Sequence, residues 1–453
     1  MTTRRAVMWF RRDLRLSDHP ALLAAAQVGE VVPLFVIDPV FDRTGAPRRA
    51  FLHDCLLRLD ASLRDLGAPG LLVRAGRPEE VVPSVCAEFS ADVVVVSRDF
   101  APGGRARDAA VAAALRTAGR ELRGTGSPYA VTPGSVTKGN GEPYAVFTPF
   151  SRAWRSAGWD LPFDPPEAAR WATLDEPLGQ LGQRPHPGCD VPAAGEEAAL
   201  TRWARFLGAR LDDYSDGRDR PDVEGTSRMS VDLKWGTVHP RTLLADLVAD
   251  GTGPDSHTRF SAELAWREFY ADVLFRNPIT AWENLNPKMN ALEVDTDSEA
   301  RTRFRSWCAG ETGFGFVDAG MRELAATGWM HNRARMITAS FLVKDLHLPW
   351  QWGARWFLRH LVDGDLASNN HGWQWVAGTG TDAAPFFRVF SPERQRERFD
   401  PDGAYVDRWV GATVAPMVDH AAERVEALRR FEATKRSQRI DGRPQSGGDR
   451  SVR

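Results

Sequence analysis

Runs of apolar, β-branched residues alternate with helical patterns through the first 130 residues of the chain. The apolar runs lie at residues 6–10, 31–37, 71–74 and 92–96, and the helical patterns lie near residues 20–26, 50–66, 78–89 and 105–118. Parallel strands that are buried on both faces have continuous apolar sequences, and helices connect them. This alternation predicts a doubly wound α/β domain over residues 1–130. The first strand is not followed by GxGxxG, which disfavours an ordinary dinucleotide-binding dehydrogenase.

The character of the sequence changes after this region. Residues 131–195 are rich in Pro, Gly and Trp and show few periodicities, so we expect an interdomain connection there. From Glu196 to about Arg430, helical periodicity dominates and strand signals fade. Residues 431–453 are polar and basic, and we expect a disordered tail. The predicted fold is therefore an N-terminal parallel-sheet domain followed by an all-helical domain over residues 196–430.

Charge and cysteine content narrow the classes of protein to consider. The formal net charge is only −2, so any contact with nucleic acid requires a local basic patch. No CxxC pair occurs, which argues against zinc and iron–sulfur sites, and isolated cysteines suit a reducing cytosol. The N-terminus lacks the apolar segment of a signal peptide, and no apolar run is long enough to span a membrane. We therefore expect a cytoplasmic protein without a metal site.

Tryptophan is concentrated in the helical half of the chain. Twelve of the 16 tryptophans lie after position 200, and several fall in a dense stretch from Asp318 to Pro392. Indole is well suited to stacking on a flat ring and to passing single electrons. No metal or haem signature lies nearby. This clustering points to an aromatic redox cofactor inside the helical domain.

One candidate surface lies on a predicted helix over residues 329–342. Trp329, Asn332 and Met336 are spaced i, i+3 and i+7 and would share one helix face. Such a face could stack on a heteroaromatic base and hydrogen-bond to it, with Arg333 and Arg335 reaching phosphates. The alternative is that Trp329, Asn332 and Met336 pack in the core, where the Asn332 amide is hydrogen-bonded within the protein. Arg333 and Arg335 would then lie on a solvent-exposed face of the helix.

A second candidate is the polar segment over residues 363–370. Its carboxylates could accept hydrogen bonds from hydroxyl or ring N–H groups of a cofactor. Asn369 could either donate to or accept from a ring nitrogen, which an ionised carboxylate cannot do. The alternative is a helix-capping loop, which Asp and Asn favour for local reasons.

Two further segments could bind a nucleotide. The run EGTSRMS at residues 224–230 combines a Gly turn, hydroxyls and an arginine, which suits a pyrophosphate. Glu263, Trp266 and Arg267 would share a helix face, where a buried carboxylate beside an indole could accept from a pyrimidine; the alternative is a surface ion pair. A phosphate-contacting rim could also form from Arg218, Arg388 and Gln395.

Six motifs in order resemble the photolyase/cryptochrome family over about residues 5–425. They are MWFRRDLRLSDHPAL, PYAVFTPFSRAW, VEGTSRMS, ELAWREFY, TGWMHNRARMITASFLVKDL and DGDLASNNHGWQWVAGTGTDAAPFFRVFSP. The resemblance implies an α/β antenna domain, a helical domain that binds FAD, and repair of ultraviolet-damaged DNA. Within the family, the chain resembles the class I cyclobutane-pyrimidine-dimer photolyases. The 6-4 photolyases carry a His pair where Asn332 and Met336 stand, and that pair is absent here.

The resemblance also implies roles for individual residues. The FAD-binding residues would be Tyr214, Thr226, Ser227, Arg228, Met229, Ser230, Glu263, Trp329, Asn332, Arg335, Asp363, Gly364, Asp365 and Asn369. The catalytic residues around the dimer and the reactive ring would be Glu263, Trp266, Asn332, Met336, Asn369 and Trp375. The DNA-binding residues would be Arg218, Trp266, Arg267, Asn332, Arg333, Arg388 and Gln395.

The chain departs from the family pattern in its tryptophan relay. The two inner steps match Trp373 and Trp350, but the outer position aligns near Asp297, where no aromatic residue occurs. Possible substitutes are Trp307, Trp352 and Trp356. Gly315 stands where the family usually has Pro, and we expect only a local loop change there.

The implied cofactors are FAD, active in its reduced anionic form, and a second antenna chromophore, either a deazaflavin or methenyltetrahydrofolate. Candidate antenna contacts at strand ends are Arg11, Asp38, Arg49 and Asp99. The implied partner is damaged DNA, with no membrane and no obligate protein partner, and we expect a monomer. Two alternatives stay open: a cryptochrome-type blue-light receptor without repair activity, and an α/β nucleotide-binding protein without flavin.

Overall fold

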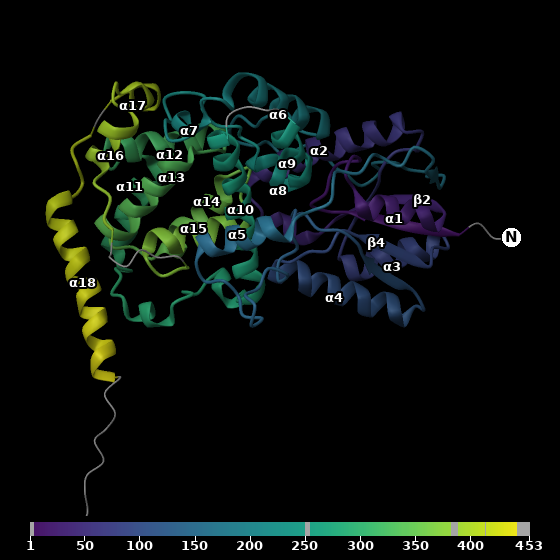
Figure 1. The fold of residues 1–453 in the computed structure, drawn as a ribbon, viewed down its shortest axis with the longest axis horizontal. Coiled ribbons are helices and arrows are strands. Elements are labelled where there is room, and N and C mark those ends of the chain that lie inside the picture. Colours follow the sequence, from purple (N-terminus) through teal and green to yellow (C-terminus); the bar gives the residue numbers. More distant parts are fainter. Residues whose placement is uncertain (1–3, 250–253, 382–387, 413, 442–453) are drawn as a thin grey trace, which may run out of the picture.

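A parallel β-sheet forms the centre of the N-terminal domain in the computed structural model, which describes residues 4–249, 254–381, 388–412 and 414–441 (Figure 1). The strand order is β3-β2-β1-β4-β5, and β6 pairs with β2. Strands β1, β2 and β4 consist almost entirely of buried apolar residues, as expected for a sheet that is covered on both faces. The bounds are β1 Arg5–Phe10, β2 Glu30–Ile37, β3 Leu72–Ala75, β4 Val93–Val96, β5 Glu121–Gly124 and β6 Arg170–Trp171.

Helices cover both faces of this sheet. Helices α1 (Pro20–Val28) and α2 (Ala46–Asp65) pack in one core cluster, and α3 (Pro78–Glu88) and α4 (Pro102–Thr117) pack in another on the opposite face. Alternate residues of β1 enter the two clusters, because successive side chains of a strand point to opposite faces. The predicted doubly wound α/β architecture is therefore confirmed.

The remaining described residues are mainly helical (Figure 1). Helix α5 (Phe147–Ala157) lies within the segment expected to be a connection, and α6 begins at Glu196 as predicted. The other helices are α6 Glu196–Arg210, α7 Tyr214–Gly217, α8 Ser230–Trp235, α9 Pro240–Ala249, α10 Pro254–Arg276, α11 Ser298–Ala309, α12 Gly315–Thr327, α13 Asn332–Ser340, α14 Trp350–His360, α15 Leu366–Ala377, α16 Pro392–Phe399, α17 Ala404–Trp409 and α18 His420–Asp441. Short 3₁₀ turns are η1 Pro39–Arg43, η2 Pro278–Ala281 and η3 Pro287–Ala291. No helix of the described part of the chain has both the length and the apolarity needed to cross a bilayer.

Helix α13 differs from the helix predicted over residues 329–342. It begins at Asn332, because the side chain of His331 caps it by accepting a hydrogen bond from the backbone N–H of Arg333 at 3.1 Å. It then continues into a π-helical turn, η4 (Phe341–Asp345). Trp329 therefore lies before the helix, and the expected single face of Trp329, Asn332 and Met336 is wrong.

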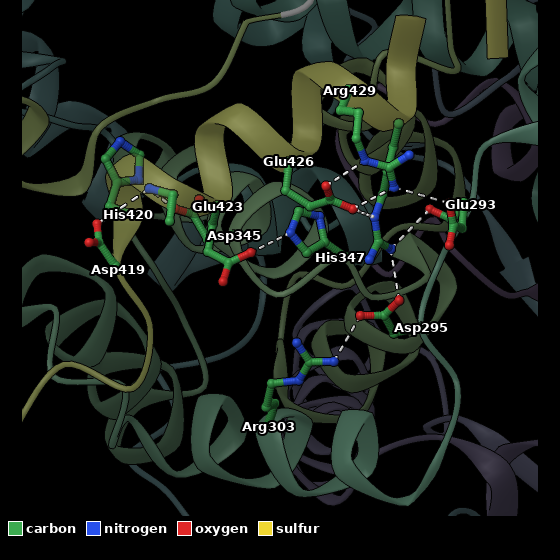
Figure 2. Close-up of polar contacts among 12 residues, drawn as sticks. Glu293, Asp295, Arg303, Asp345, His347, Asp419, His420, Glu423, Glu426 and Arg429 are labelled. Carbon is green, nitrogen blue, oxygen red and sulfur yellow. Dashed lines mark hydrogen bonds and ion pairs between the residues drawn. The ribbon is translucent and has the colours of Figure 1, made fainter. Parts of the chain in front are cut away.

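Helix α18 extends through residues 431–441, about half of the region expected to be a disordered tail. It continues to Asp441, and charged side chains fasten it to the preceding domain (Figure 2). Arg430 pairs with Asp295 at 2.7 Å, and the ring nitrogen Nε2 of His347 lies 2.6 Å from a carboxylate oxygen of Glu423. His420 contacts the buried Asp345 of the π-helical turn. Composition alone does not reveal these long-range pairs, and residues 442–453 lie outside the described part.

Candidate functional site

The loop that precedes α8 meets the loop that precedes α13. Arg228 adopts a positive φ of 54°, a backbone conformation that non-glycine residues rarely adopt. Its guanidinium lies over the indole of Trp329, 4.4 Å from the ring centroid. Tyr214, which opens α7, is buried, and burial raises the pKa of its phenol. The structure thus brings together two segments, residues 226–230 and Trp329, that are about 100 positions apart in the sequence.

Asp363 supplies a buried acceptor between α14 and α15. Its Oδ2 accepts a hydrogen bond from Nη2 of Arg335 at 2.8 Å, and Nε of Arg335 donates to the carbonyl oxygen of Met330. The second carboxylate oxygen, Oδ1, is buried without a hydrogen-bond partner. A buried acceptor that stays unpaired is costly, so this oxygen suits an N–H donor from a bound group.

Helix α15 presents the polar segment predicted from the sequence. Asp365 caps it, since Oδ1 accepts from the backbone N–H groups of Ala367 and Ser368 at 3.0 and 3.2 Å. The capping alternative therefore applies to Asp365. The amide nitrogen of Asn369 donates to the carbonyl oxygen of Ala354 and to the side chain of Asn370. Gly364 lies in the tight turn between Asp363 and this cap.

Asp365 also joins the helical domain to the α/β domain. Its Oδ2 lies 2.6 Å from Nη2 of Arg12, which follows β1, and 3.9 Å from Nζ of Lys234. Burial alone would raise the pKa of this carboxyl, but Arg12 and Lys234 lower it well below its ordinary value. For Lys234, burial outweighs the attraction of Asp365. Burial, with a smaller contribution from the neighbouring Arg12, lowers the pKa of the Lys234 ammonium to about 7.

Four charged side chains connect α7, α10 and α13. Arg218 donates through Nη2 to Glu263 at 2.7 Å, and Asp219 accepts from Nη2 of Arg333 at 2.6 Å. The side chain of Glu263 is 35% exposed and paired with Arg218. The buried carboxylate expected at this position is therefore wrong, and so is the alternative of a surface pair with Arg267.

Apolar and amide groups complete the neighbourhood of these charges. The Sδ atom of Met336 lies 3.9 Å from the amide nitrogen of Asn332 and 3.7 Å from Nη1 of Arg333. The indole of Trp266 stacks on Phe147, with ring centroids 3.7 Å apart and planes 7° apart. The contacts therefore run from Asn332 and Met336 through Arg333 and Asp219 to Arg218 and Glu263.

The other predicted DNA contacts lie in different surroundings. Arg267 donates to the carbonyl oxygens of Pro128 and Leu233, and its guanidinium lies over Tyr129. It therefore links α10 to α8 and to the end of the α/β domain. Arg388 is exposed, and its carbonyl oxygen accepts a hydrogen bond from Lys344 of the π-helical turn. Gln395 lies in the first turn of α16.

The predicted relay tryptophans lie inside the helical domain. Trp373 and Trp375 belong to α15 and Trp350 opens α14, where its indole N–H donates to Asn284 at 2.9 Å. Trp307 contacts Trp373 edge to face, with ring centroids 6.1 Å apart. Phe304 joins Trp307 to the candidate substitutes Trp352 and Trp356 at centroid distances of 5.4 and 6.3 Å.

A pocket opens at the carboxyl ends of β1 and β2, beside the domain interface. Two of the four predicted antenna residues, Arg11 and Asp38, line it. The other two do not, since Arg49 pairs with Asp42 and Asp99 pairs with Arg107. Arg48 and Lys234 were not predicted because they come from segments distant in the sequence, whereas Arg12 directly follows the predicted Arg11 and could have been found from that neighbour. The lining includes Trp9, Phe35, Phe41, Trp235, Arg12, Arg48, Arg107 and Lys234.

Comparisons with known proteins agree with this architecture. The family profile described as DNA photolyase matches residues 6–169, and the profile described as FAD binding domain of DNA photolyase matches residues 260–415. A deoxyribodipyrimidine photo-lyase of Thermus thermophilus is 40% identical over 427 residues, which cover 94% of this chain and 97% of that protein. The chain therefore belongs to the photolyase/cryptochrome family, and to its DNA photolyase branch of lyases.

Two solved structures show the same fold over nearly the whole chain. A class III photolyase of Agrobacterium tumefaciens gives a TM-score of 0.90 at 34% identity and covers 96% of this chain and 98% of its own. A cryptochrome of Synechocystis sp. PCC6803 gives a TM-score of 0.86 at 26% identity, with coverage of 95% and 100%. The helical domain is thus an FAD-binding domain, and the roles of single residues stay predictions.

Proposed function

We propose that this protein is a light-dependent DNA repair enzyme that splits cyclobutane pyrimidine dimers. The observation that carries the proposal is the row of contacts that runs from Asn332 and Met336 through Arg333 and Asp219 to Arg218 and Glu263. This row brings a carboxylate, two guanidinium groups, an amide and a thioether into one network, next to the segment that carries Trp329. These groups match the donors and acceptors of a pyrimidine edge. Membership in the DNA photolyase branch supports the same substrate.

The site residues fit FAD. The unpaired Oδ1 of buried Asp363 offers an acceptor for a ring N–H group, and Arg335 fixes the carboxylate that supplies it. The hydroxyls and backbone of residues 226–230 would hold the phosphates, with Arg228 and Trp329 beside them. Reduced FAD, when bound and excited by light, supplies the electron that opens the cyclobutane ring.

The protein side chains bind and orient the substrate. A dimer is weakly stacked in duplex DNA, so turning it out of the helix costs only a few kcal/mol. Trp266 offers a ring face for stacking, and Glu263 offers an acceptor for a pyrimidine N–H group. Arg218, Arg333 and Arg388 would hold phosphates, which makes affinity depend on salt.

We also propose that the pocket beside β1 and β2 binds the second, light-harvesting chromophore. Its aromatic walls suit a flat ring, and its cations Arg11, Arg12, Arg48 and Lys234 suit an anionic substituent. Deazaflavin and methenyltetrahydrofolate remain the two candidates. Release of the bound pigments and their identification by absorption and mass would distinguish them.

A blue-light receptor without repair activity is the second candidate, and the likeness to the Synechocystis cryptochrome favours it. The deciding experiment illuminates the purified, reduced holoprotein with a dimer-containing oligonucleotide and measures restored thymine. Repair under blue light and none in darkness supports the enzyme. Absence of repair, together with a flavin spectrum that changes under light, would establish the receptor.

A further inference from the structure

Asp219 lies between two arginines that face the proposed DNA-binding side of the site. Its Oδ1 lies 2.6 Å from Nη2 of Arg333 and 4.0 Å from Nε of Arg218. Arg218 also pairs with Glu263 at 2.7 Å. The order of contacts is therefore Glu263, Arg218, Asp219 and Arg333, so that acids and bases alternate.

This row of contacts has no net charge and remains partly open to solvent. The side chains of Arg218 and Arg333 are 21% and 18% exposed, and those of Glu263 and Asp219 are 35% and 39% exposed. A carboxylate and a phosphate oxygen occupy the same guanidinium donors, so Asp219 competes with a DNA phosphate. The positive potential that undamaged DNA would meet is correspondingly reduced.

The same carboxylate has a different effect once a dimer enters the site. If Glu263 turns to accept from the dimer, Arg218 loses its closest partner. Asp219 is already 4.0 Å from Arg218 and bound to Arg333, so it can keep both guanidinium groups in place. Asp219 thus opposes binding that depends on phosphates alone and supports binding in which Glu263 contacts the dimer.

We propose that Asp219 is a positioning residue that determines how well the protein distinguishes damaged from undamaged DNA. The inference rests on the proposed repair function. Asp219 acts through Arg218 and Arg333 and need not touch the DNA itself.

The test measures dissociation constants of the full-length holoprotein for one oligonucleotide duplex with and without a single thymine dimer. In Asp219→Asn, affinity for undamaged DNA rises and the ratio of the two constants falls about fivefold or more, as expected within one charged network. The salt dependence of undamaged binding also steepens, by about one unit of logarithmic slope, since one more phosphate is neutralised.

Asp216→Asn is the matched control. Asp216 lies in the neighbouring helix α7 and is exposed, and its substitution removes the same charge three residues away. Asp216→Asn should leave the ratio of the two dissociation constants close to that of the wild type. Asp219→Glu, which retains the negative charge, should keep most of the wild-type ratio. An unchanged ratio in Asp219→Asn, or an equal fall in Asp216→Asn, overturns the proposal.

A double-mutant cycle that combines Asp219→Asn with Arg333→Gln provides a second readout. Because Asp219 acts in part through Arg333, the loss of discrimination in the double variant should be smaller than the sum of the two single losses, and additive losses overturn the proposal. A wild-type protein that binds both duplexes equally would instead contradict the repair function itself.

Discussion

The indole of Trp307 contacts the indole of Trp373 edge to face, at a centroid distance of 6.1 Å. Trp307 is fully buried, so it cannot serve as the surface end of a relay. Phe304 continues the aromatic contacts to Trp352 and Trp356, which are both partly exposed. The position aligned with the family's outer tryptophan, Asp297, instead caps helix α11. These contacts suggest where the missing outer step could run.

We predict that Trp373→Phe abolishes the photoreduction of oxidised FAD by external donors, and that Trp307→Phe slows it severalfold. Both variants should repair normally once their flavin is chemically reduced, because that electron passes directly to the dimer. Flavin absorbance during illumination measures the rate. Trp171→Phe, in the α/β domain, is the control. If Trp307→Phe photoreduces at the wild-type rate, the electron path leaves through Trp350 instead. If Trp352→Phe or Trp356→Phe stops photoreduction, that tryptophan is the outer residue of the relay.

Glu263→Ala should lower repair yield per absorbed photon more than it lowers affinity for damaged DNA. The substitution removes the proposed acceptor for the dimer, while it releases Arg218 from its 2.7 Å ion pair for phosphate contact. Yield should fall by about tenfold, equivalent to the loss of one charged hydrogen bond of about 1.5 kcal/mol. Actinometry and DNA titration measure the two quantities. Lost affinity with an unchanged yield would contradict this role.

Arg12→Met should destabilise the whole chain. The substitution leaves the largely buried Asp365 without the guanidinium that lies 2.6 Å away. Removing one partner of a buried ion pair costs about 3–5 kcal/mol. We expect about 3 kcal/mol, because both side chains keep some contact with solvent. Urea unfolding followed by fluorescence measures the loss, and FAD should dissociate earlier in the titration. Arg77→Met, which breaks an exposed pair with Glu79, should leave the midpoint unchanged. Equal effects of the two variants would rule out the interface role.

Lys234→Met should change how stability depends on pH. The pKa of Lys234 is about 7 in the folded protein and about 10.4 in the unfolded chain. Burying the charged ammonium therefore lowers the free energy of unfolding by its full amount below pH 7 and by less as the pH rises. The variant should therefore be more stable at pH 7, and its advantage should shrink by about 2 kcal/mol between pH 7 and pH 9. Lys138→Met, at an exposed lysine, should show no such trend. A constant advantage across this range would mean that Lys234 does not titrate there.

Glu423→Gln should loosen α18. Glu423 accepts from the buried His347 at 2.6 Å, and loss of a charged hydrogen bond of this kind costs about 1.5 kcal/mol. Limited proteolysis near residue 420 and urea unfolding would both report it. Glu432→Gln, which breaks an exposed pair with Lys435 on the same helix, is the matched control. Similar proteolysis of both variants would indicate that apolar packing alone holds the helix.

Local patterns predicted much of the fold. Buried runs such as residues 31–37 are visible in the sequence because every position is apolar. Strand β5 was missed because Glu121–Gly124 is a short edge strand with charged residues. The helix start at Asn332 was misplaced by three residues, since periodicity does not reveal that His331 forms the cap.

The site was predictable as a set of segments, and its pairings were not. The motifs identified Glu263 and Arg218 separately, but their ion pair joins residues 45 positions apart. Asp219 carried no signal, because one aspartate among several charged neighbours resembles an ordinary solvated turn. The contact between Arg12 and Asp365 was not predictable either, because it depends on how the two domains pack against each other.

Asp365 makes the two halves of this chain difficult to exchange. One carboxylate oxygen caps a helix of the FAD-binding domain, and the other is held by an arginine that follows the first strand of the α/β domain. A chimera that takes its α/β domain from a relative would have to bring an arginine at the matching place, or Asp365 would keep only its longer 3.9 Å contact with Lys234. The α/β domain and the FAD-binding domain are therefore constrained to change together at this contact.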